Sequence, residues 1–418
     1  MPRLPPALLQ RARSVSPDLA TLLPACRDLE SARNELRWIR EHVSAAALLS
    51  PGQARHPRAA SSFSEAPTAK VRRDGRSNHE NKVVSGLCRR RARGEPLQYL
   101  LGSQPFGPLE IQCRRGVLIP RPETESWTYA LAEDIVARLA SAAASHGRNG
   151  TSEGKRSRLR IVDLCTGTGC IPLLLYALLH KRFRDVRVWG FDIEERAVRL
   201  ARENLRYNIT RGFLPSSLLP TEHTGASEGG NGDGSEVIRF EKADIFADDW
   251  SESITQQEGG SDGIDVLVSN PPYISTKGFH RDTGRSVRNF EPRLALVPRP
   301  RDDERSAPCA PEDVFYQRLC EVAETLRPKI MLFEVGDLEQ ALRVAQMASL
   351  TAGERLRDIE IWRDYPDVVE EQGGTGDSDS NGNSNSNSNI TPTETYIEGT
   401  KVSIKGSGHG RSILVHLR

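Results

Sequence analysis

The sequence has few cysteines and no paired arrangement of them. Seven cysteines are scattered through 418 residues, and no two form a Cys-x-x-Cys pair. An odd number of dispersed cysteines argues against a disulfide framework and against a zinc site, so we expect no metal. Long apolar runs are also absent, since no stretch approaches the roughly 20 residues that cross a bilayer. We therefore expect no membrane partner.

Acidic residues are missing from the start of the chain. Before Asp18 there are three arginines and neither Asp nor Glu, which is typical of a mitochondrial transit peptide over residues 1–17, although a frayed terminus explains it equally well. The first hundred residues hold 18 Lys and Arg against 9 Asp and Glu, while the whole chain has a net charge of only +1. A basic region of this kind can contact nucleic acid or an acidic partner, but a solvated basic face is the commoner explanation.

The next segment has the periodicity of a small helical domain, expected over 18–105. Apolar residues recur every three or four positions from Leu22 to Ala47, which predicts an amphipathic helix. Residues 51–78 are rich in Pro, Ser, Ala and Arg, so we expect a disordered insertion there. A second helix is expected from about Glu80 to Arg93.

A turn-rich linker over 106–122 precedes the larger domain, expected over 123–418. Its β-like pieces at Leu109–Cys113 and Val117–Ile119 predict a hairpin. Strand and helix patterns then alternate, with strands expected at Leu159–Leu164, Val186–Phe191, Val237–Phe240, Ile264–Ser269 and Ile330–Val335. This alternation predicts an α/β fold with a doubly wound, mainly parallel sheet.

Three polar segments interrupt the α/β pattern. They cover residues 211–235, 251–262 and 372–408, and their composition cannot bury a core. We expect all three to be insertions. The segment Ser412–Leu417 alternates as a strand does, so a late strand is expected to return to the sheet.

A glycine loop lies between the first strand of the α/β pattern and the next helix. It contains Asp163, Cys165, Thr166, Gly167, Thr168 and Gly169. Glycines let the backbone approach a ligand closely, and a helix amino terminus offers unpaired N–H groups. Pro172 stands where a dinucleotide-binding fingerprint has its third glycine. The loop therefore favours S-adenosylmethionine over a dinucleotide as the cofactor.

Two carboxylates follow later strands. Asp192 lies 25 residues after Gly167, where a carboxylate can accept both ribose hydroxyls, although a helix-capping role is the simpler alternative. Asp244 could face the adenine amine with Ile245 or Phe246 against the ring, but an acidic surface loop has the same composition.

The motif Asn270-Pro271-Pro272-Tyr273 follows a buried strand, at the edge where open α/β sheets bind ligands. A planar amide or amine nitrogen is a poor nucleophile because its lone pair is delocalised, so a methyltransferase must orient it. The Asn270 side-chain oxygen and the Pro271 carbonyl can accept its N–H groups, and Tyr273 can stack on the planar group. Pro271 and Pro272 fix the loop in advance. A proline turn that only ends a strand is the structural alternative.

Together these segments resemble the HemK/PrmC family of protein-glutamine N5-methyltransferases, which modify the Gly-Gly-Gln motif of translational release factors. The resemblance rests on the blocks Leu29–Arg33, Glu95–Gly102, Val117–Glu125, Asp163–Cys170, Ser269–Ile274, Glu291–Leu296 and Phe333–Gly336. It implies a seven-stranded, Rossmann-like class I methyltransferase domain, joined by the hairpin to a helical domain that holds the release factor.

The resemblance also implies residue roles. S-adenosylmethionine would contact Cys165–Gly169, Asp192, Ile245 and Asn270, while Asn270 and Pro271 hold the glutamine amide beside Tyr273. Arg121 and Glu123 are secondary substrate candidates, although a helix start explains both. The polar insertions and arginine-rich start fit a eukaryotic member in the mitochondrial matrix, and we expect a monomer.

Three other functions fit part of the sequence. The Asn-Pro-Pro-Tyr motif is shared with N6-adenine methyltransferases, which would use it on a flipped base. Those enzymes predict a recognition domain that is not evident, so no nucleic-acid substrate is expected. Pro172 disfavours a nicotinamide-dependent oxidoreductase. The intact motif at Asn270–Tyr273 disfavours a catalytically silent binding protein.

Overall fold

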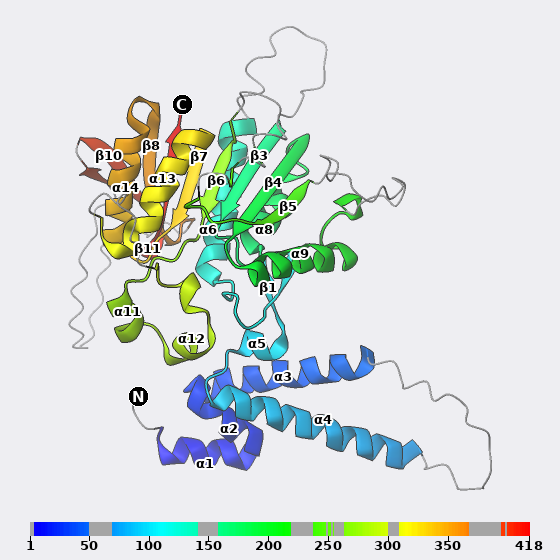
Figure 1. Cartoon of the computed structure of the whole chain (residues 1–418). Helices are drawn as coiled ribbons and strands as arrows, with labels where there is room; N and C mark the ends of the chain where they lie inside the picture. Colours follow the sequence, from blue (N-terminus) through cyan, green and yellow to red (C-terminus); the bar gives the residue numbers. More distant parts are fainter. Residues whose placement is uncertain are drawn as a thin grey trace, which may run out of the picture. The chain divides into compact units, whose positions relative to one another are not determined.

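The computed structural model (Figure 1) describes residues 4–49, 69–140, 158–218, 237–247, 250–251, 254, 263–299, 309–367, 394–397 and 399–418. The chain divides into two compact units. The helical unit comprises Met1–Gln104 and Gly284–Glu291, and the sheet unit comprises Pro105–Thr283 and Pro292–Arg418. None of the helices in the described ranges is both long and apolar enough to cross a membrane.

The helical unit packs its helices around a leucine-rich core. Its helices are α1 (Pro6–Val15), α2 (Pro17–Cys26), α3 (Leu29–Leu49), α4 (Ala69–Ala92), α5 (Leu97–Leu101) and α12 (Arg285–Phe290). Arg27 is left-handed, with φ of 73°, and separates α2 from α3. The single helix expected from Leu22 to Ala47 is therefore two helices, because no interior helical residue can adopt that backbone conformation.

The structure also bears on the expected insertion and on the amino-terminal segment of this unit. Helix α4 begins at Ala69 rather than near Glu80, so residues 69–78 of the expected disordered insertion are helical. The remaining residues, 51–68, lie outside the described part of the chain. Within the segment read as a transit peptide, Pro6–Val15 form α1, and Ala12 is buried in the core of the helical unit.

The hairpin of the linker is β1 (Ser103–Phe106) paired with β2 (Leu109–Gln112). Val117–Ile119, expected as a strand, are not one; instead Val117 and Ile119 are buried as loop residues. Their apolar side chains are explained by packing rather than by strand pairing.

The sheet unit carries the remaining elements. They are α6 (Pro122–Ile135), η1 (Val136–Ala140), β3 (Arg158–Leu164), α8 (Cys170–Leu179), β4 (Asp185–Asp192), α9 (Glu195–Thr210), η2 (Ser216–Leu218), β5 (Ile238–Lys242), β6 (Val266–Ser269), α11 (Thr276–Arg281), η3 (Arg293–Ala295), η4 (Pro311–Asp313), α13 (Val314–Leu326), β7 (Ile330–Glu334), α14 (Leu338–Ala352), η5 (Gly353–Arg355), β8 (Leu356–Tyr365), β9 (Glu394–Ile397), β10 (Thr400–Lys405) and β11 (Ser407–Leu417).

The strands form one sheet in the order β5-β4-β3-β6-β7-β11-β8-β10-β9. Strands β3 to β7 pair in parallel, while β11 runs antiparallel between β7 and β8. This architecture confirms the predicted doubly wound, Rossmann-like α/β fold (Figure 1).

The sheet has nine described strands rather than the expected seven. The two additional strands, β9 and β10, come from residues 394–405, which the sequence analysis placed in a polar insertion. Val402 and Ile404 of β10 are buried, so this short piece supplies enough apolar surface to extend the sheet. Residues 372–393 lie outside the described ranges, as do 219–235 and most of 251–262.

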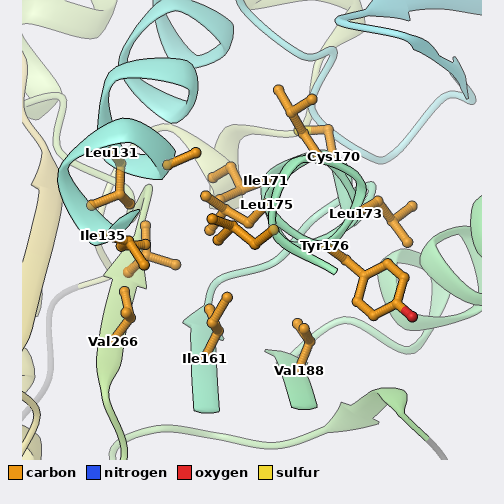
Figure 2. Close-up of a cluster of buried hydrophobic side chains, with 14 of the residues drawn as sticks. Leu131, Ile135, Ile161, Cys170, Ile171, Leu173, Leu175, Tyr176, Val188 and Val266 are labelled. Carbon is orange, nitrogen blue, oxygen red and sulfur yellow. The ribbon is translucent and has the colours of Figure 1, made fainter. Parts of the chain in front are cut away.

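Both faces of the sheet are buried, and successive residues of a strand alternate between them. On β3, Ile161 belongs to one apolar cluster, while Val162 belongs to the cluster on the opposite face. Figure 2 shows the first cluster, where Leu131 and Ile135 of α6 and Ile171 of α8 lie over β3, β4 and β6. This packing holds the amino-terminal ends of α6 and α8 at the carboxyl edge of the strands.

Candidate active site

The loops that carry the predicted site follow neighbouring parallel strands. At the ends of these strands, Leu164 of β3 is paired with Phe191 of β4 and with Ser269 of β6. Ser269 is paired in turn with Phe333 of β7. The segments after all four strands therefore meet at one edge of the sheet, which is where doubly wound folds bind ligands.

A cavity of about 360 Å³ opens at this edge of the sheet. This volume is in the range of small-molecule binding sites. The predicted residues that line it are Arg121, Cys165, Thr166, Gly167, Thr168, Asp192, Asp244, Ile245, Asn270 and Pro272. Other predicted residues do not contribute to its wall: Asp163, Gly169, Pro271, Tyr273 and Glu123.

The glycine loop makes a tight turn between β3 and α8. The Gly169 N–H donates to the Thr166 carbonyl over 2.8 Å, and Gly169 is left-handed with φ of 77°. Pro172 lies in the first turn of α8, where the missing N–H costs nothing. At Gly167, a Cβ atom would meet no atom within 4 Å. The loop backbone is therefore exposed to the cavity, as close approach of a ligand requires.

Asp192 accepts backbone hydrogen bonds from the loops around it and can still accept bonds from a ligand. Its Oδ2 accepts the Gly167 N–H and its Oδ1 accepts the Glu194 N–H, both over 2.9 Å. Burial raises the pKa of the Asp192 carboxyl, and these two backbone bonds act against that rise. Asp192 does not cap the next helix, since the N-cap residue of α9 is Glu194 and no side chain caps it. Each carboxylate oxygen of Asp192 retains capacity for a second hydrogen bond, which the proposed ribose role requires.

Asp163 is a fully buried carboxyl at the end of β3, beside the loop in sequence. Neither of its oxygens has a hydrogen-bond partner among the described residues, and burial raises its pKa well above the usual range. An unpartnered buried carboxyl is costly unless a ligand supplies donors or positive charge. S-adenosylmethionine carries an ammonium group, a sulfonium and two ribose hydroxyls, so the polar groups of this site fit that cofactor.

The loop after β5 forms another wall of the cavity. The Asp244 Oδ1 accepts the Phe246 N–H over 3.0 Å, and Ile245 is buried. Arg318 of α13 donates to the Ile245 carbonyl over 2.7 Å and to the Ala247 carbonyl over 3.0 Å. The backbone of this loop is thus anchored to a helix, with Phe246 also packed edge-to-face on Phe315.

The Asn270–Tyr273 motif is held by a buried carboxylate. The Asn270 Nδ2 donates to the Thr124 hydroxyl over 3.3 Å, and Thr124 donates to Glu334 Oε2 over 2.6 Å. Tyr273 donates its hydroxyl to Glu334 Oε1 over 3.0 Å. Burial, together with the charge of Glu334, raises the pKa of Tyr273, so its phenol stays protonated.

Several site residues were not predicted from the sequence. Thr124, Ile193 and Phe315 line the cavity, and Glu334 lies behind it. Glu334 carried a signal that could have found it, because it is an acidic residue in the apolar strand segment Ile330–Val335. The described residues contain no cluster of three or more His, Cys, Asp or Glu side chains that could hold a metal ion.

Comparison with known proteins places the chain among glutamine methyltransferases, although no family model matches it. The mitochondrial MRF1 N(5)-glutamine methyltransferase MTQ1 of Saccharomyces cerevisiae is 30% identical over 298 residues, covering 71% of this chain and 68% of that protein. A probable MRF1 mitochondrial N(5)-glutamine methyltransferase of Schizosaccharomyces pombe is 28% identical and covers 82% and 87%. The release factor glutamine methyltransferase of Chlorobaculum tepidum is 30% identical and covers 68% and 76%.

Among solved structures, the amino-terminal domain of human METTL16 in complex with SAH aligns with a TM-score of 0.37 at 14% identity, covering 78% of this chain and 81% of that one. The relatives establish the family at the level of sequence. The cofactor predicted from the glycine loop, S-adenosylmethionine, is that of a methyltransferase. The resemblance seen in the sequence blocks is thereby confirmed: this chain belongs to the family of release factor N(5)-glutamine methyltransferases.

Proposed function

We propose that the chain transfers a methyl group from S-adenosylmethionine to the side-chain amide nitrogen of the glutamine in the Gly-Gly-Gln motif of a mitochondrial release factor. The observation that carries this proposal is the position of Asn270 in the same cavity wall as the glycine loop and Asp192. One cavity therefore holds cofactor-binding groups together with a side chain that can grip a planar amide. Family membership supports the glutamine substrate.

The cofactor would be held by the loop Cys165–Gly169, with Asp192 at the ribose and with Asp244 and Ile245 at the adenine. When bound, S-adenosylmethionine supplies a methyl group on a positively charged sulfur, which is a good leaving group. Placing the acceptor nitrogen in line with that methyl group is the work left to the protein.

Asn270 and Pro271 would hold the acceptor amide. The Asn270 Oδ1 and the Pro271 carbonyl accept its two N–H groups, so they orient the nitrogen and stabilise the positive charge that develops on it. Tyr273 directs its hydroxyl to Glu334 and not to the cavity. Its ring would pack beside the acceptor, while its hydroxyl bond fixes the loop.

The release factor itself would contact both units. We assign its recognition to the helical unit and the linker, with Arg121 and Glu123 as secondary contacts. Arg121 lines the cavity, and Glu123 lies in the first turn of α6 without reaching the cavity wall. Nucleic acid is not proposed as a substrate.

A transfer assay tests the proposal. The purified protein is incubated with radiolabelled S-adenosylmethionine and a mitochondrial release factor, with a Gly-Gly-Ala version of that factor and adenine-containing DNA in parallel. Label is expected on the Gly-Gly-Gln factor alone. Label on the DNA, or equal label on both factor versions, would overturn the glutamine assignment.

Asn270→Ala tests the acceptor grip. Removing a group that stabilises transition-state charge costs on the order of 100- to 1000-fold in turnover, so methyl transfer should nearly vanish. Binding of S-adenosylmethionine, measured by calorimetry, should largely survive because the glycine loop and Asp192 are untouched. Unchanged turnover would remove Asn270 from the mechanism.

We also propose that the protein works in the mitochondrial matrix. Two fungal relatives are named as mitochondrial enzymes. The arginine-rich segment before Asp18 supports the same compartment.

A further inference from the structure

We propose that Thr124 and Glu334 are positioning residues that decide which end of the Asn270 amide faces the acceptor. The inference rests on the proposed function, since it concerns the side chain that would grip the glutamine. It adds a requirement on the orientation of the Asn270 amide, because the protein must present the amide oxygen and not the NH2 group to its substrate.

A chain of hydrogen bonds leads from the buried carboxylate to the cavity. Asn270 Nδ2 lies 3.3 Å from the Thr124 hydroxyl, which lies 2.6 Å from Glu334 Oε2. Thr124 and Glu334 are 2% and 1% exposed, so water does not replace either partner. Thr124 and Asn270 both line the cavity. The chain thus ends on the residue proposed to touch the acceptor.

The polarity of this chain is set by proton counting. Trp127 donates its indole N–H to the same Oε2 over 2.8 Å, and Tyr273 donates to Oε1 over 3.0 Å. An ionised carboxylate has no proton to donate, so Glu334 in its charged form accepts from all three of these side chains. The single proton of the Thr124 hydroxyl must then point to the carboxylate, which leaves only lone pairs toward Asn270.

Only the NH2 end of the Asn270 amide can donate a hydrogen bond to these lone pairs of Thr124. The two ends of an asparagine amide have nearly the same shape, so packing alone would not choose between them. With the NH2 group engaged by Thr124, Oδ1 is the end left for the acceptor. In the flipped orientation, an NH2 group would face the N–H groups of the substrate, and two donors would oppose each other.

The buried carboxylate is suited to this task. Burial raises the pKa of Glu334, whereas the donors from Thr124, Trp127 and Tyr273 stabilise its charged form. Its backbone is fixed as well, since the Tyr316 hydroxyl donates to the Glu334 carbonyl over 2.7 Å. While Glu334 is ionised it can only accept these bonds, so it holds the Asn270 amide in one orientation.

Thr124→Val is the central test, because valine keeps the shape of threonine and removes the hydroxyl. Since small misplacements of catalytic groups cost about 100-fold in rate, kcat for release-factor methylation should fall by about that factor. Affinity for S-adenosylmethionine should be unchanged. Thr124→Ser keeps the hydroxyl, so this variant should retain most of the wild-type kcat.

Thr128→Val is the matched control. Thr128 lies one turn further along α6, is fully buried, and donates its hydroxyl to the Thr124 carbonyl over 2.6 Å. Its substitution removes a buried hydroxyl from the same helix but none of the bonds that reach Asn270. Methylation by this variant should match the wild type. An equal loss in both valine variants would mean that helix packing explains the effect, and would overturn the inference.

A double-mutant cycle separates positioning from general damage. In an Asn270→Ala background there is no amide left to orient, so adding Thr124→Val should cause no further loss of turnover. Losses that multiply would contradict the inference.

Glu334→Gln tests whether acceptance or charge matters. A glutamine oxygen can still accept from Thr124 and Trp127, so a positioning role predicts that this folded variant keeps most of its turnover. A loss as large as that of Thr124→Val would assign the carboxylate a role through its charge and overturn the orientation argument.

A readout without an acceptor distinguishes this inference from the proposed function. The side-chain amide signals of Asn270, assigned as those missing in Asn270→Ala, should shift in a proton–nitrogen spectrum of Thr124→Val and return in Thr124→Ser. If the wild type methylates the release factor but Thr124→Val changes neither the Asn270 amide signals nor kcat, the inference fails and the proposed function stands. If the wild type leaves the release factor unlabelled, the proposed function fails, and the spectrum still decides the orientation.

Discussion

Two glycines in the cofactor loop have different structural reasons for lacking a side chain. Both Gly167 and Gly169 are left-handed, with φ of 56° and 77°. A Cβ at Gly169 would lie 3.0 Å from Ala201 and from Phe240, whereas a Cβ at Gly167 would meet nothing within 4 Å. Gly169 is thus required by packing against the sheet as well as by backbone strain, and Gly167 by strain and ligand approach.

This difference predicts unequal effects of alanine at the two positions. Left-handed backbone costs a non-glycine residue about 1–2 kcal/mol, and this cost applies to both variants. Gly169→Ala adds crowding against Ala201 and Phe240, so its free energy of unfolding should fall further than that of Gly167→Ala. Denaturant titration measures both values. Equal decreases in the free energy of unfolding would show that Ala201 and Phe240 move aside at no energetic cost.

The sequence identified individual polar residues of the site, but not the hydrogen bonds that each of them makes. The helix-capping interpretation of Asp192 was wrong, because no side chain caps α9. Its bonds to Gly167 and Glu194 instead hold the glycine loop and leave lone pairs for a ribose. The roles assigned to the site residues remain predictions. Glu334 was visible in the sequence as an acidic residue in an apolar strand, but its donors Thr124, Trp127 and Tyr273 lie far away in the chain and no local pattern indicates them.

At the scale of elements, an ionic cluster joins α6 to the carboxyl-terminal part of the sheet. His416 of β11 is 2% exposed. Its Nε2 is bonded to Asp134 of α6 over 2.8 Å, and its Nδ1 is bonded to Asp358 of β8. Arg138 of η1 contacts Asp134 over 2.9 Å and Asp358 over 3.4 Å. Since α6 also carries Thr124, the cluster helps to place the helix behind the acceptor loop.

The titration of this cluster makes the stability of the protein depend on pH. Burial lowers the pKa of His416, but its bonds to Asp134 and Asp358 outweigh that effect and raise it above the usual value. Burial raises the pKa of each aspartate, while the bonds and charge of His416 and the charge of Arg138 bring it below the usual value. The histidine contribution is complete below the unfolded pKa of about 6.5 and is lost as pH rises through the folded pKa. The aspartate contributions are lost as pH falls through their folded values.

We therefore expect the free energy of unfolding to decrease as pH rises above about 6.5, by no more than about 1.4 kcal/mol per pH unit for one proton. In His416→Gln this decrease should be absent. His409→Gln, a change at an exposed histidine, should keep the wild-type dependence. Unfolding measured over a pH series checks this, and the same slope in His416→Gln as in the wild type would rule out His416 as its source.

Edge strands were the least predictable elements. Glu394–Ile397 and Thr400–Lys405 stand within a polar stretch, so local composition favours an insertion over a strand. Strand β10 exists because β8 offers a free edge and pairs with it in parallel, Val402 opposite Ile359. A tertiary partner outweighed local propensity there, as is common for strands.

At the scale of the whole molecule, the amino-terminal helix α1 combines packing with a targeting composition. Ala12 faces the core of the helical unit, while Arg11 and Arg13 are exposed. The two arginines can therefore be changed without removing a core side chain, which makes the proposed mitochondrial location testable at these positions.

Reversal of this charge should abolish import. In a chain carrying a fluorescent protein at its carboxyl end, Arg11→Glu with Arg13→Glu should redistribute the signal from mitochondria to the cytosol. Arg33→Glu with Arg40→Glu, which reverses the same charge at exposed positions of α3, should leave the distribution unchanged. Mitochondrial signal from the Arg11 and Arg13 variant would show that targeting information lies elsewhere.

The sequence by itself determined the fold class, the order of the main strands and helices, and the motifs at the strand ends. These features are local, because hydrophobic periodicity and glycine or proline positions act over a few residues. Tertiary structure decided the rest. The pairing of β10 with β8 and the Glu334–Thr124–Asn270 hydrogen bonds join positions far apart in the chain. Such contacts follow from which buried donors and acceptors must be satisfied in the folded core, and no local pattern encodes that requirement.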